Sequence, residues 1–403
     1  MSSVLLIVTK YKHDDGSPWL ISEFADEMVA QGFDVTVLNL SWKNSSAHKA
    51  IEENDDKKYR RPRIFDFPTV DISFLRVGVA LKWGLSSFKL IPFLFRQMLL
   101  GKRYDIFVSF SPCTAVYAAV KIANRISRKS FLIYWDLFPL HNQAIKKSVP
   151  TGAMPLLKRM ERRLVGSFDT VLCMGKGNRK VFLDYFREHE SRVGILPIWT
   201  SILNSPRVNR LDVRRRYSLP EHALIFVFGG QLVEGRGIKN LCDAFHDVAS
   251  KGEDVVLAFC GSGPLEAEIK FYEEGSVRGV RLIGALPRTE YMEILAASDV
   301  GVISAISEEG TSSFPSKSLD YMACSLPILA VLELGNDLGR TILEKNMGVV
   351  CDSDDVRAIS LSIQELIRQR EDFDLLGANG NSHLNITHSV SKVVEKFTEI
   401  ANV

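Results

Sequence analysis

Short apolar runs alternate with longer amphipathic stretches along this 403-residue chain. The runs have the length and residue types of buried strands, whereas the stretches between them repeat their apolar positions with helical spacing. Such an alternation predicts parallel sheets built from βαβ units. In the first half the predicted strands are Val4–Thr9, Asp34–Leu38, Asp105–Phe110, Ser130–Trp135, Asp169–Met174 and Val193–Leu196.

The alternation restarts in the second half, with predicted strands at Ala223–Phe228, Asp254–Cys260, Val280–Ile283, Asp299–Ile303, Pro327–Val331 and Gly348–Cys351. The pattern therefore predicts an α/β protein with two successive doubly wound parallel sheets. Between them, Thr200–Pro220 mixes proline, asparagine and charge without apolar periodicity, as linkers do. We expect an N-terminal domain over residues 1–200, a linker over 201–220, a C-terminal domain over 221–385 and a final helical segment over 386–403.

Composition narrows the class of protein. A hydrophobic content of 46% and a charged content of 24% are ordinary for a globular chain. No window has the run of about eighteen apolar residues that a transmembrane helix needs, and the N-terminal SVLLIV lacks the flanks of a signal peptide, so we expect a cytoplasmic protein. The six cysteines show no C-x-x-C spacing, which predicts buried reduced thiols rather than disulfides or metal ligands.

Charge is distributed unevenly. Residues 1–200 carry 30 Lys and Arg against 19 Asp and Glu, an excess of +11, whereas the rest of the chain carries 20 against 29. Within the basic half, Arg76–Tyr104 interleaves basic and aromatic residues, as a helix on an anionic membrane surface does, and Pro92 is expected to kink it. A pair of core helices with solvated lysines fits this stretch equally well. No nucleic-acid recognition module accompanies the basic residues, so nucleic acid is not an expected partner.

The most informative stretch is FPSKSLDYMACSLPI, residues 314–328. Pro315 favours the start of a helix, whose free N–H groups and dipole attract an anion. Lys317 adds a positive charge, and Asp320 lies one turn further on. Cations and N–H groups suit the phosphates of a nucleoside diphosphate, and a carboxylate suits its ribose hydroxyls. The alternative is an ordinary helix start at which Lys317 and Asp320 are merely solvated.

Two glycine-rich turns lie upstream in the same half. In VFGGQLVEGRGIKNL, Gly230 lets the backbone approach a ligand closely, and Arg236 can bind a diphosphate through two hydrogen bonds. In LAFCGSGPLEAEI, Gly261 and Gly263 follow a strand, where open α/β sheets bind ligands. A tight turn with a solvated Arg236 is the alternative for the first motif, whose spacing is neither GxGxxG nor a P-loop. Three such features in one domain favour a nucleotide site.

Two segments of the first half are further candidates. Gly16 follows the first strand, in KYKHDDGSPW. His141, in WDLFPLHNQA, is either a polar contact to a sugar or acceptor, or a structural residue. The adjacent acidic pairs Asp14-Asp15 and Asp55-Asp56 lack the Asp-x-Asp spacing of metal–diphosphate sites, so we expect neither a metal nor another cofactor.

The stretch at 314–328 resembles the donor-binding motif of the family-four retaining glycosyltransferases, which have two facing Rossmann-like domains in the GT-B fold. Many members carry two glutamates separated by seven residues; here the second position holds Asp320 and the first holds Ser312. Pro-Ser-Lys followed by an acidic residue and Tyr-Met-Ala, together with Asp-Leu-Phe-Pro just before His141, is similar to a bacterial surface-polysaccharide branch of that family.

The resemblance implies roles for individual residues. Arg236 and Lys317 would stabilise the departing diphosphate, and Asp320 would bind the ribose. The base would be read largely by backbone groups around Leu286, and the final helix, Ser389–Ala401, would cross back onto the N-terminal domain. The remaining donor contacts that it implies are Gly16, Gly230, Gly261, Gly263, Ser313, and either Glu308 or Glu309 in place of the missing first glutamate.

We therefore expect a GT-B glycosyltransferase, transferring a hexose or N-acetylhexosamine from a UDP- or GDP-sugar. The expected acceptor is a lipid-linked oligosaccharide of bacterial surface polysaccharide biosynthesis, such as that of lipopolysaccharide O-antigen. The enzyme would work at the inner face of the cell membrane, docked through its N-terminal domain. Retention of anomeric configuration is implied by the resemblance alone. Two alternatives stay open: a sugar-nucleotide epimerase on the same scaffold, and a non-catalytic partner that binds a nucleotide sugar.

Overall fold

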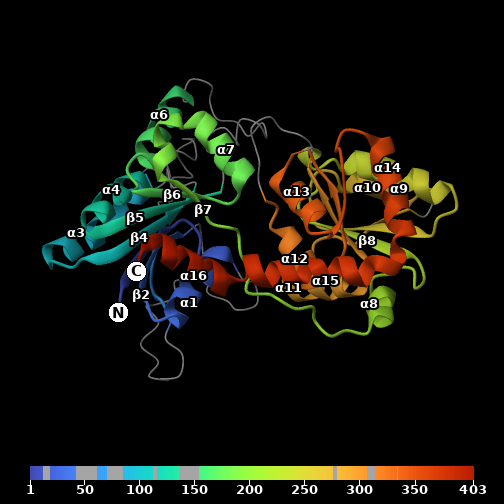
Figure 1. The fold of residues 1–403 in the computed structure, drawn as a ribbon, viewed down its shortest axis with the longest axis horizontal. Coiled ribbons are helices and arrows are strands. Elements are labelled where there is room, and N and C mark those ends of the chain that lie inside the picture. Colours follow the sequence, from blue (N-terminus) through green and yellow to red (C-terminus); the bar gives the residue numbers. More distant parts are fainter. Residues whose placement is uncertain are drawn as a thin grey trace. The chain divides into compact units, whose positions relative to one another are not determined.

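The computed structural model describes residues 1–11, 19–41, 61–69, 85–111, 116–135, 154–275, 279–305, 314–333 and 335–403. The chain divides into two compact units, Met1–Ile198 with Val390–Val403, and Trp199–Ser389 (Figure 1). Each unit contains one parallel sheet with helices packed on it. The prediction of two doubly wound α/β domains is confirmed.

The first unit is built on a seven-stranded sheet. Its central strands are buried on both faces, which is why they appear in the sequence as continuous apolar runs. The edge strand β3 was not predicted, because its residues are mostly exposed and it ends in a proline. In spatial order the strands are β3 (Arg63–Pro68), β2 (Asp34–Ser41), β1 (Ser3–Val8), β4 (Tyr104–Phe110), β5 (Ser127–Tyr134), β6 (Thr170–Cys173) and β7 (Val193–Ile195).

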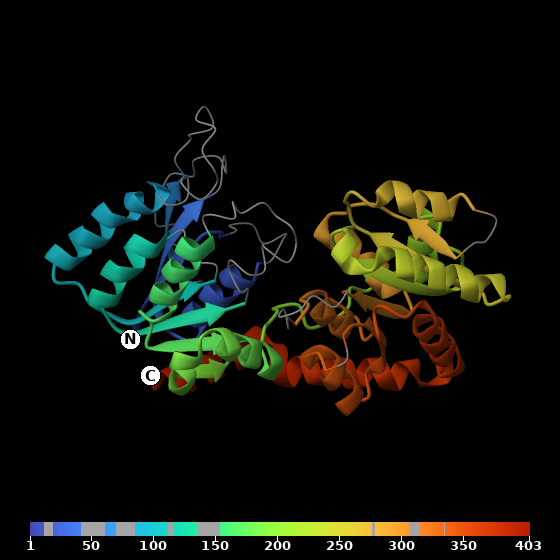
Figure 2. The same ribbon diagram turned by 90° about the horizontal axis from the view of Figure 1, so that it is seen from above.

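Helices cover both faces of this sheet. One face packs on α3 (Ile91–Leu99), α4 (Tyr117–Arg125), α6 (Met154–Val165) and α7 (Lys176–Tyr185), with the turn η4 (Arg187–Arg192) following α7. The other face packs on α1 (Leu20–Ala30) and the C-terminal helix α16 (Val390–Ala401). Phe397 of α16 holds these layers together: its ring centroid lies 5.2 Å from that of Phe24 and 5.1 Å from that of Phe131. In both views the C-terminal helix α16, drawn in red, lies within the first unit (Figures 1 and 2).

Pro92, which we expected to kink a helix in the basic, aromatic stretch, lies instead in the first turn of one. The turn η1 (Phe88–Leu90) leads directly into α3, and Pro92 is the second residue of that helix. A proline is tolerated in the first turn because the N–H group that it lacks would have no partner within the helix. Leu90 and Leu94 point into the core, whereas Phe88, Phe95 and Leu99 are exposed.

The second unit has a six-stranded parallel sheet in which β8 lies between β9 and β11. The strand order runs outward in both directions from the neighbours β8 and β11, so the chain reverses its winding there. In open α/β sheets, ligands bind outside the carboxyl ends of the strands at such a point. In spatial order the strands are β10 (Val280–Leu282), β9 (Val255–Cys260), β8 (Leu224–Gly229), β11 (Val300–Ser304), β12 (Ile328–Val331) and β13 (Gly348–Cys351).

Side chains of β8 point alternately to the two faces of this sheet. Phe226 and Phe228 belong to a core with residues of α9 and α14, whereas Ile225 belongs to a separate cluster on the other side. The helical elements are α8 (Arg210–Arg216), η5 (Glu234–Arg236), α9 (Ile238–Ser250), α10 (Glu266–Glu273), α11 (Arg288–Ala297), α12 (Lys317–Ala323), α13 (Asp337–Glu344), α14 (Val356–Arg368), η6 (Arg370–Asp372), α15 (Phe373–His383) and the π-helical η7 (Leu384–His388).

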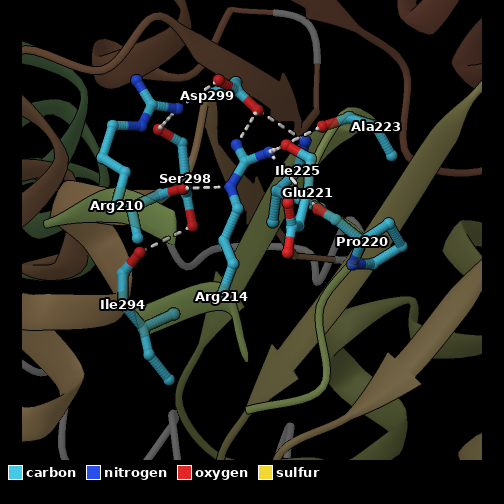
Figure 3. A network of polar contacts seen from close by, with 10 residues as sticks. Arg210, Arg214, Pro220, Glu221, Ala223, Ile225, Ile294, Ser298 and Asp299 are labelled. Carbon is cyan, nitrogen blue, oxygen red and sulfur yellow. Dashed lines mark hydrogen bonds and ion pairs between the residues drawn. The ribbon is translucent and has the colours of Figure 1, made fainter. Parts of the chain in front are cut away.

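Residues 201–220, predicted to be a linker, belong to the second unit and contain α8. Arg214 of this helix is 5% exposed, and it donates to the carbonyls of Glu221, Ala223 and Ala297 (Figure 3). It also donates to the carboxylate of Asp299 at 2.8 Å. Because α8 buries only Val213 and Arg214, it has too few apolar positions for apolar periodicity to reveal it.

The described cysteines, which exclude Cys113, are free and buried, as the sequence predicts. They are Cys173, Cys242, Cys260, Cys324 and Cys351. Within the described ranges, no helix combines the length and the apolar character needed to span a membrane.

Candidate functional site

Two predicted cations meet at the carboxyl ends of β8 and β11. Arg236 ends the turn η5 that follows β8, and Lys317 is the first residue of α12, the next described helix after β11. The positive charge of Arg236 lowers the pKa of Lys317. Next to them, Gly230 has a φ of +130°, which side-chain-bearing residues rarely adopt, and a Cβ atom there would lie 3.3 Å from the Lys317 Nζ. The fold thus brings together residues from two separate motifs.

Lys317 has both favourable and unfavourable surroundings for its charge. Its Nζ lies 4.0 Å from the centroid of the Phe228 ring, a cation–π contact that favours the charged form. Burial and, to a smaller extent, the positive Arg236 lower the pKa of Lys317 from 10.5 to about 7, although the Asp320 carboxylate acts in the opposite direction. Two like charges kept close together cost energy until an anion binds between them. Such an arrangement is typical of a site for a phosphate group.

The glycines of the next loop have a packing role. A Cβ at Gly261 would lie 1.8 Å from the carbonyl oxygen of Gly230, and one at Gly263 would lie 2.3 Å from that of Leu232. The two loops are hydrogen-bonded, with the Gly230 N–H donating to Cys260 at 2.9 Å. Gly261 and Gly263 therefore let the β8 and β9 loops touch each other. Donor contacts at these two glycines remain a prediction.

Asp320 is a buried partner of Arg288 rather than a solvated helix residue. Its carboxylate accepts a hydrogen bond from the Arg288 Nη1 at 2.7 Å and a second, shorter one from Nη2. Only 11% of the Asp320 side chain is exposed. The sequence analysis did not include Arg288 among the site residues. An arginine beginning a helix in ALPRTEY was visible, but its pairing with a carboxylate 32 residues away was not.

Two tyrosines, Tyr291 and Tyr321, pack against the strands β8 and β11 beside the site. The Tyr321 hydroxyl donates to the carbonyl of Val302 at 3.0 Å and accepts from the N–H of Gly229 at 3.1 Å, so it joins β11 to β8. Burial raises the pKa of Tyr321 well above its ordinary value. A side chain at Gly301 would collide with the Tyr321 ring, and one at Gly229 would collide with the Tyr291 hydroxyl. These contacts fix α12, and with it Lys317 and Asp320, against the sheet.

Of the other predicted site residues, the structure describes Leu286. Leu286 is half-buried in the connection between β10 and α11, where its predicted role near the base stays a prediction. Outside the described residues lie Gly16, His141, Glu308, Glu309 and Ser313. In the part of the chain that the structure describes, no cluster of three or more His, Cys, Asp or Glu side chains is suited to hold a metal ion.

The chain is similar in sequence to known glycosyltransferases. Residues 209–383 match the family described as glycosyl transferases group 1. The chain is 28% identical over 320 residues to the probable glycosyltransferase WbjE of Pseudomonas aeruginosa, covering 76% of each chain.

Solved structures show the same fold. The chain superposes on HepE of Anabaena, solved in complex with UDP, with a TM-score of 0.69 at 12% identity over 100% of both chains. It superposes on WaaG, a glycosyltransferase involved in lipopolysaccharide biosynthesis, with a TM-score of 0.67 at 14% identity over 99% of both chains. The family match covers the part of the chain that carries Arg236, Lys317 and Asp320. Residues 209–383 therefore resemble the glycosyl transferases group 1, and the chain shares the two-domain GT-B fold of these structural neighbours.

Proposed function

We propose that this protein is a glycosyltransferase that moves a hexose or N-acetylhexosamine from a UDP- or GDP-sugar to a lipid-linked saccharide in bacterial surface polysaccharide biosynthesis. The observation that carries the proposal is the convergence of Arg236 and Lys317 beside Gly230 at the switch point of the second sheet. The UDP complex of HepE supports a nucleotide-sugar donor. The role of WaaG in lipopolysaccharide biosynthesis supports the acceptor class.

The proposed chemistry needs charge stabilisation above all. When the bond from the sugar to the diphosphate breaks, negative charge develops on the leaving oxygen, and cations held in place beforehand stabilise it. Arg236 supplies a permanent charge with two hydrogen bonds, and Lys317 supplies a charge that the bound phosphate itself favours. In this proposal the resulting bond keeps the anomeric configuration of the donor.

Two measurements test the transferase proposal. A panel of UDP- and GDP-sugars is first scored by the rise in melting temperature, because a ligand that binds the folded state stabilises it. Each stabilising sugar is then incubated with the protein and membrane extract, and release of free nucleoside diphosphate is followed. We expect release only in the presence of the extract. Conversion of the donor without an acceptor would indicate an epimerase, and binding without turnover would indicate a non-catalytic partner.

The proposed acceptor places the enzyme at a membrane. Around α3, the exposed apolar side chains of Leu85, Phe88, Phe95, Leu99 and Leu100 lie among basic residues. We name these five residues, with Lys89, Arg96, Lys102 and Arg103, the α3 patch. Exposed aromatic and aliphatic groups beside positive charges suit the interface of an anionic bilayer.

Vesicle flotation tests this docking. Each Lys or Arg close to an anionic surface contributes about 1 kcal/mol, so the Lys89→Glu/Arg96→Glu variant should bind vesicles containing phosphatidylglycerol at least about 30-fold more weakly. The matched control, Lys345→Glu/Arg357→Glu, makes the same charge change at exposed positions of the second unit and should bind normally. Equal flotation of both variants, or no wild-type binding at low salt, would refute docking through the α3 patch.

A further inference from the structure

We propose that Arg288 is a positioning residue for the ribose of the nucleotide. It holds the Asp320 carboxylate in one plane, so that the carboxylate's remaining lone pairs are free to accept the ribose hydroxyls. The inference rests on the proposed function, in which Asp320 binds the ribose, and it adds a residue that the donor motif does not contain.

The hydrogen bonds between Arg288 and Asp320 carry the argument. The Nη1 atom of Arg288 donates to one carboxylate oxygen and the Nη2 atom to the other, so the two groups meet as parallel forks. A carboxylate has about four lone-pair directions, and this pairing uses one on each oxygen. Among the described residues, one direction therefore remains on each oxygen, which is the number that two neighbouring hydroxyls need.

The surroundings hold this pair in place. Arg288 is the first residue of α11, and its guanidinium carbon lies 5.9 Å from the centroid of the Tyr291 ring. Asp320 lies in the first turn of α12 and is 8% exposed. A planar guanidinium held on an aromatic ring loses little freedom when it bonds a carboxylate. The position of the Asp320 oxygens is thus set from α11 as well as from α12.

The position of Arg288 in the chain also matters for specificity. It lies two residues after Leu286, in the connection that the sequence predicts to lie near the base. Asp320 lies one turn after Lys317, which is assigned to the diphosphate. Arg288 therefore joins the segment expected at the base to the helix expected at the ribose and phosphates. Loss of this link should disturb recognition of the ribose more than binding of the phosphates.

The test compares ribose with deoxyribose. Dissociation constants of UDP, GDP and their 2′-deoxy counterparts are measured by titration calorimetry on the full chain. We expect the wild-type protein to bind the better ribonucleotide about tenfold more tightly than its deoxy counterpart, the effect of losing one hydrogen bond to a charged group. Arg288→Ala should reduce this preference at least about fivefold and should leave binding of the deoxynucleotide nearly unchanged. Arg288→Lys keeps the charge but loses the fork, so it should lie between the two.

A matched control is an arginine of α8 that pairs with the same helix, α11. Arg216 pairs with Glu293 of α11 at 2.7 Å, away from Asp320, and Arg216→Ala should leave the ribose preference unchanged. Equal weakening of both nucleotides in Arg288→Ala would give Arg288 a purely structural role and overturn the inference. Should that variant fail to fold, Arg288→Gln, which keeps a single donor, replaces it.

The outcomes also separate this inference from the proposed function. Wild-type protein that binds neither UDP nor GDP would refute the proposed function. Wild-type protein that binds ribo- and deoxynucleotides equally would overturn the ribose roles of Asp320 and Arg288 and leave the diphosphate site standing.

Discussion

The two ends of the sheet in the second unit treat positive charge in opposite ways. At the amino end, Arg214 donates to backbone carbonyls and to the Asp299 carboxylate, which also accepts the N–H of Ile225 at 2.7 Å. At the carboxyl end, Lys317 lies over an aromatic ring beside a second cation, and its pKa is lowered to about 7. The amino end compensates its charge within the protein. At the carboxyl end, burial and a nearby like charge disfavour the charge of Lys317.

This difference has a physical meaning. A buried charge with a complete set of hydrogen bonds holds the fold together, and removing one partner is costly. A buried charge placed near a like charge costs stability, and such groups are concentrated in functional sites. Substitutions at the amino end should therefore change stability, and substitutions at the carboxyl end should change function.

The largest expected effect is at the amino end. Arg214→Met leaves the Asp299 carboxylate buried without its main partner, so the free energy of unfolding should fall by about 3–5 kcal/mol. Denaturant unfolding measures this loss, and nucleotide affinity of the folded fraction should stay unchanged. Arg210, which bonds the same carboxylate but has a side chain 49% exposed, provides the control. Arg210→Ala should cost at most about 1 kcal/mol. Equal losses in both variants would contradict the central role of Arg214.

Next in size is the effect on turnover at the carboxyl end. Lys317→Ala and Arg236→Ala should each lower turnover by about 10²–10³-fold, the effect of losing one preorganised charge at the leaving group. Steady-state release of nucleoside diphosphate is the measurement. Lys239, exposed on α9 and paired with Asp243, serves as the matched control, and Lys239→Ala should be nearly normal. Near-normal turnover in both site variants would rule out this donor site.

A smaller effect is expected for Asp320. Asp320→Asn keeps the shape of the side chain but removes the charge from its hydrogen bonds, so nucleotide binding should weaken by about 1.5–3 kcal/mol. Calorimetric titration gives the value. Glu293→Gln on α11 breaks the ion pair with Arg216 and is the corresponding control. An unchanged dissociation constant in Asp320→Asn would leave Asp320 as a structural partner of Arg288 only.

The smallest expected effect is a dependence of nucleotide affinity on pH. As pH rises through about 7, Lys317 loses its proton, so nucleotide affinity should fall by about tenfold in total, the loss of one charge-assisted interaction. Lys317→Arg should abolish the fall, because an arginine stays charged.

Stability should respond to pH with the opposite sign. The folded-state pKa of Lys317 lies below the ordinary value of 10.5, so the unfolded chain binds more protons between about pH 7 and 10.5. The contribution of Lys317 to the free energy of unfolding therefore rises with pH across this window. Lys317→Met should remove this contribution, which is measured as the difference between the two unfolding curves. Identical pH profiles for wild-type protein and Lys317→Met would contradict the lowered pKa.

Local sequence was sufficient to predict most of the strands and to propose candidates for the site. Buried strands such as β8 and β9 are continuous apolar runs. The glycines that follow both strands, and Arg236 after β8, lie close to those strands in the sequence. The missed elements are those whose stability comes from polar contacts or from an exposed edge. Helix α8 is anchored by Arg214, and β3 lies at the end of its sheet.

The sequence by itself therefore determined the fold class and placed Arg236, Lys317 and Asp320 as candidates, because strand periodicity and turn chemistry are local properties of the chain. Only the tertiary structure decided that Arg236 acts on Lys317, that Gly261 serves the contact between two loops, and that Arg288 bonds Asp320. It also decided that α16 packs on α1 in the first unit. Each of these contacts joins residues far apart in the sequence, and the pairing of distant side chains is settled only when sheets and helices pack together.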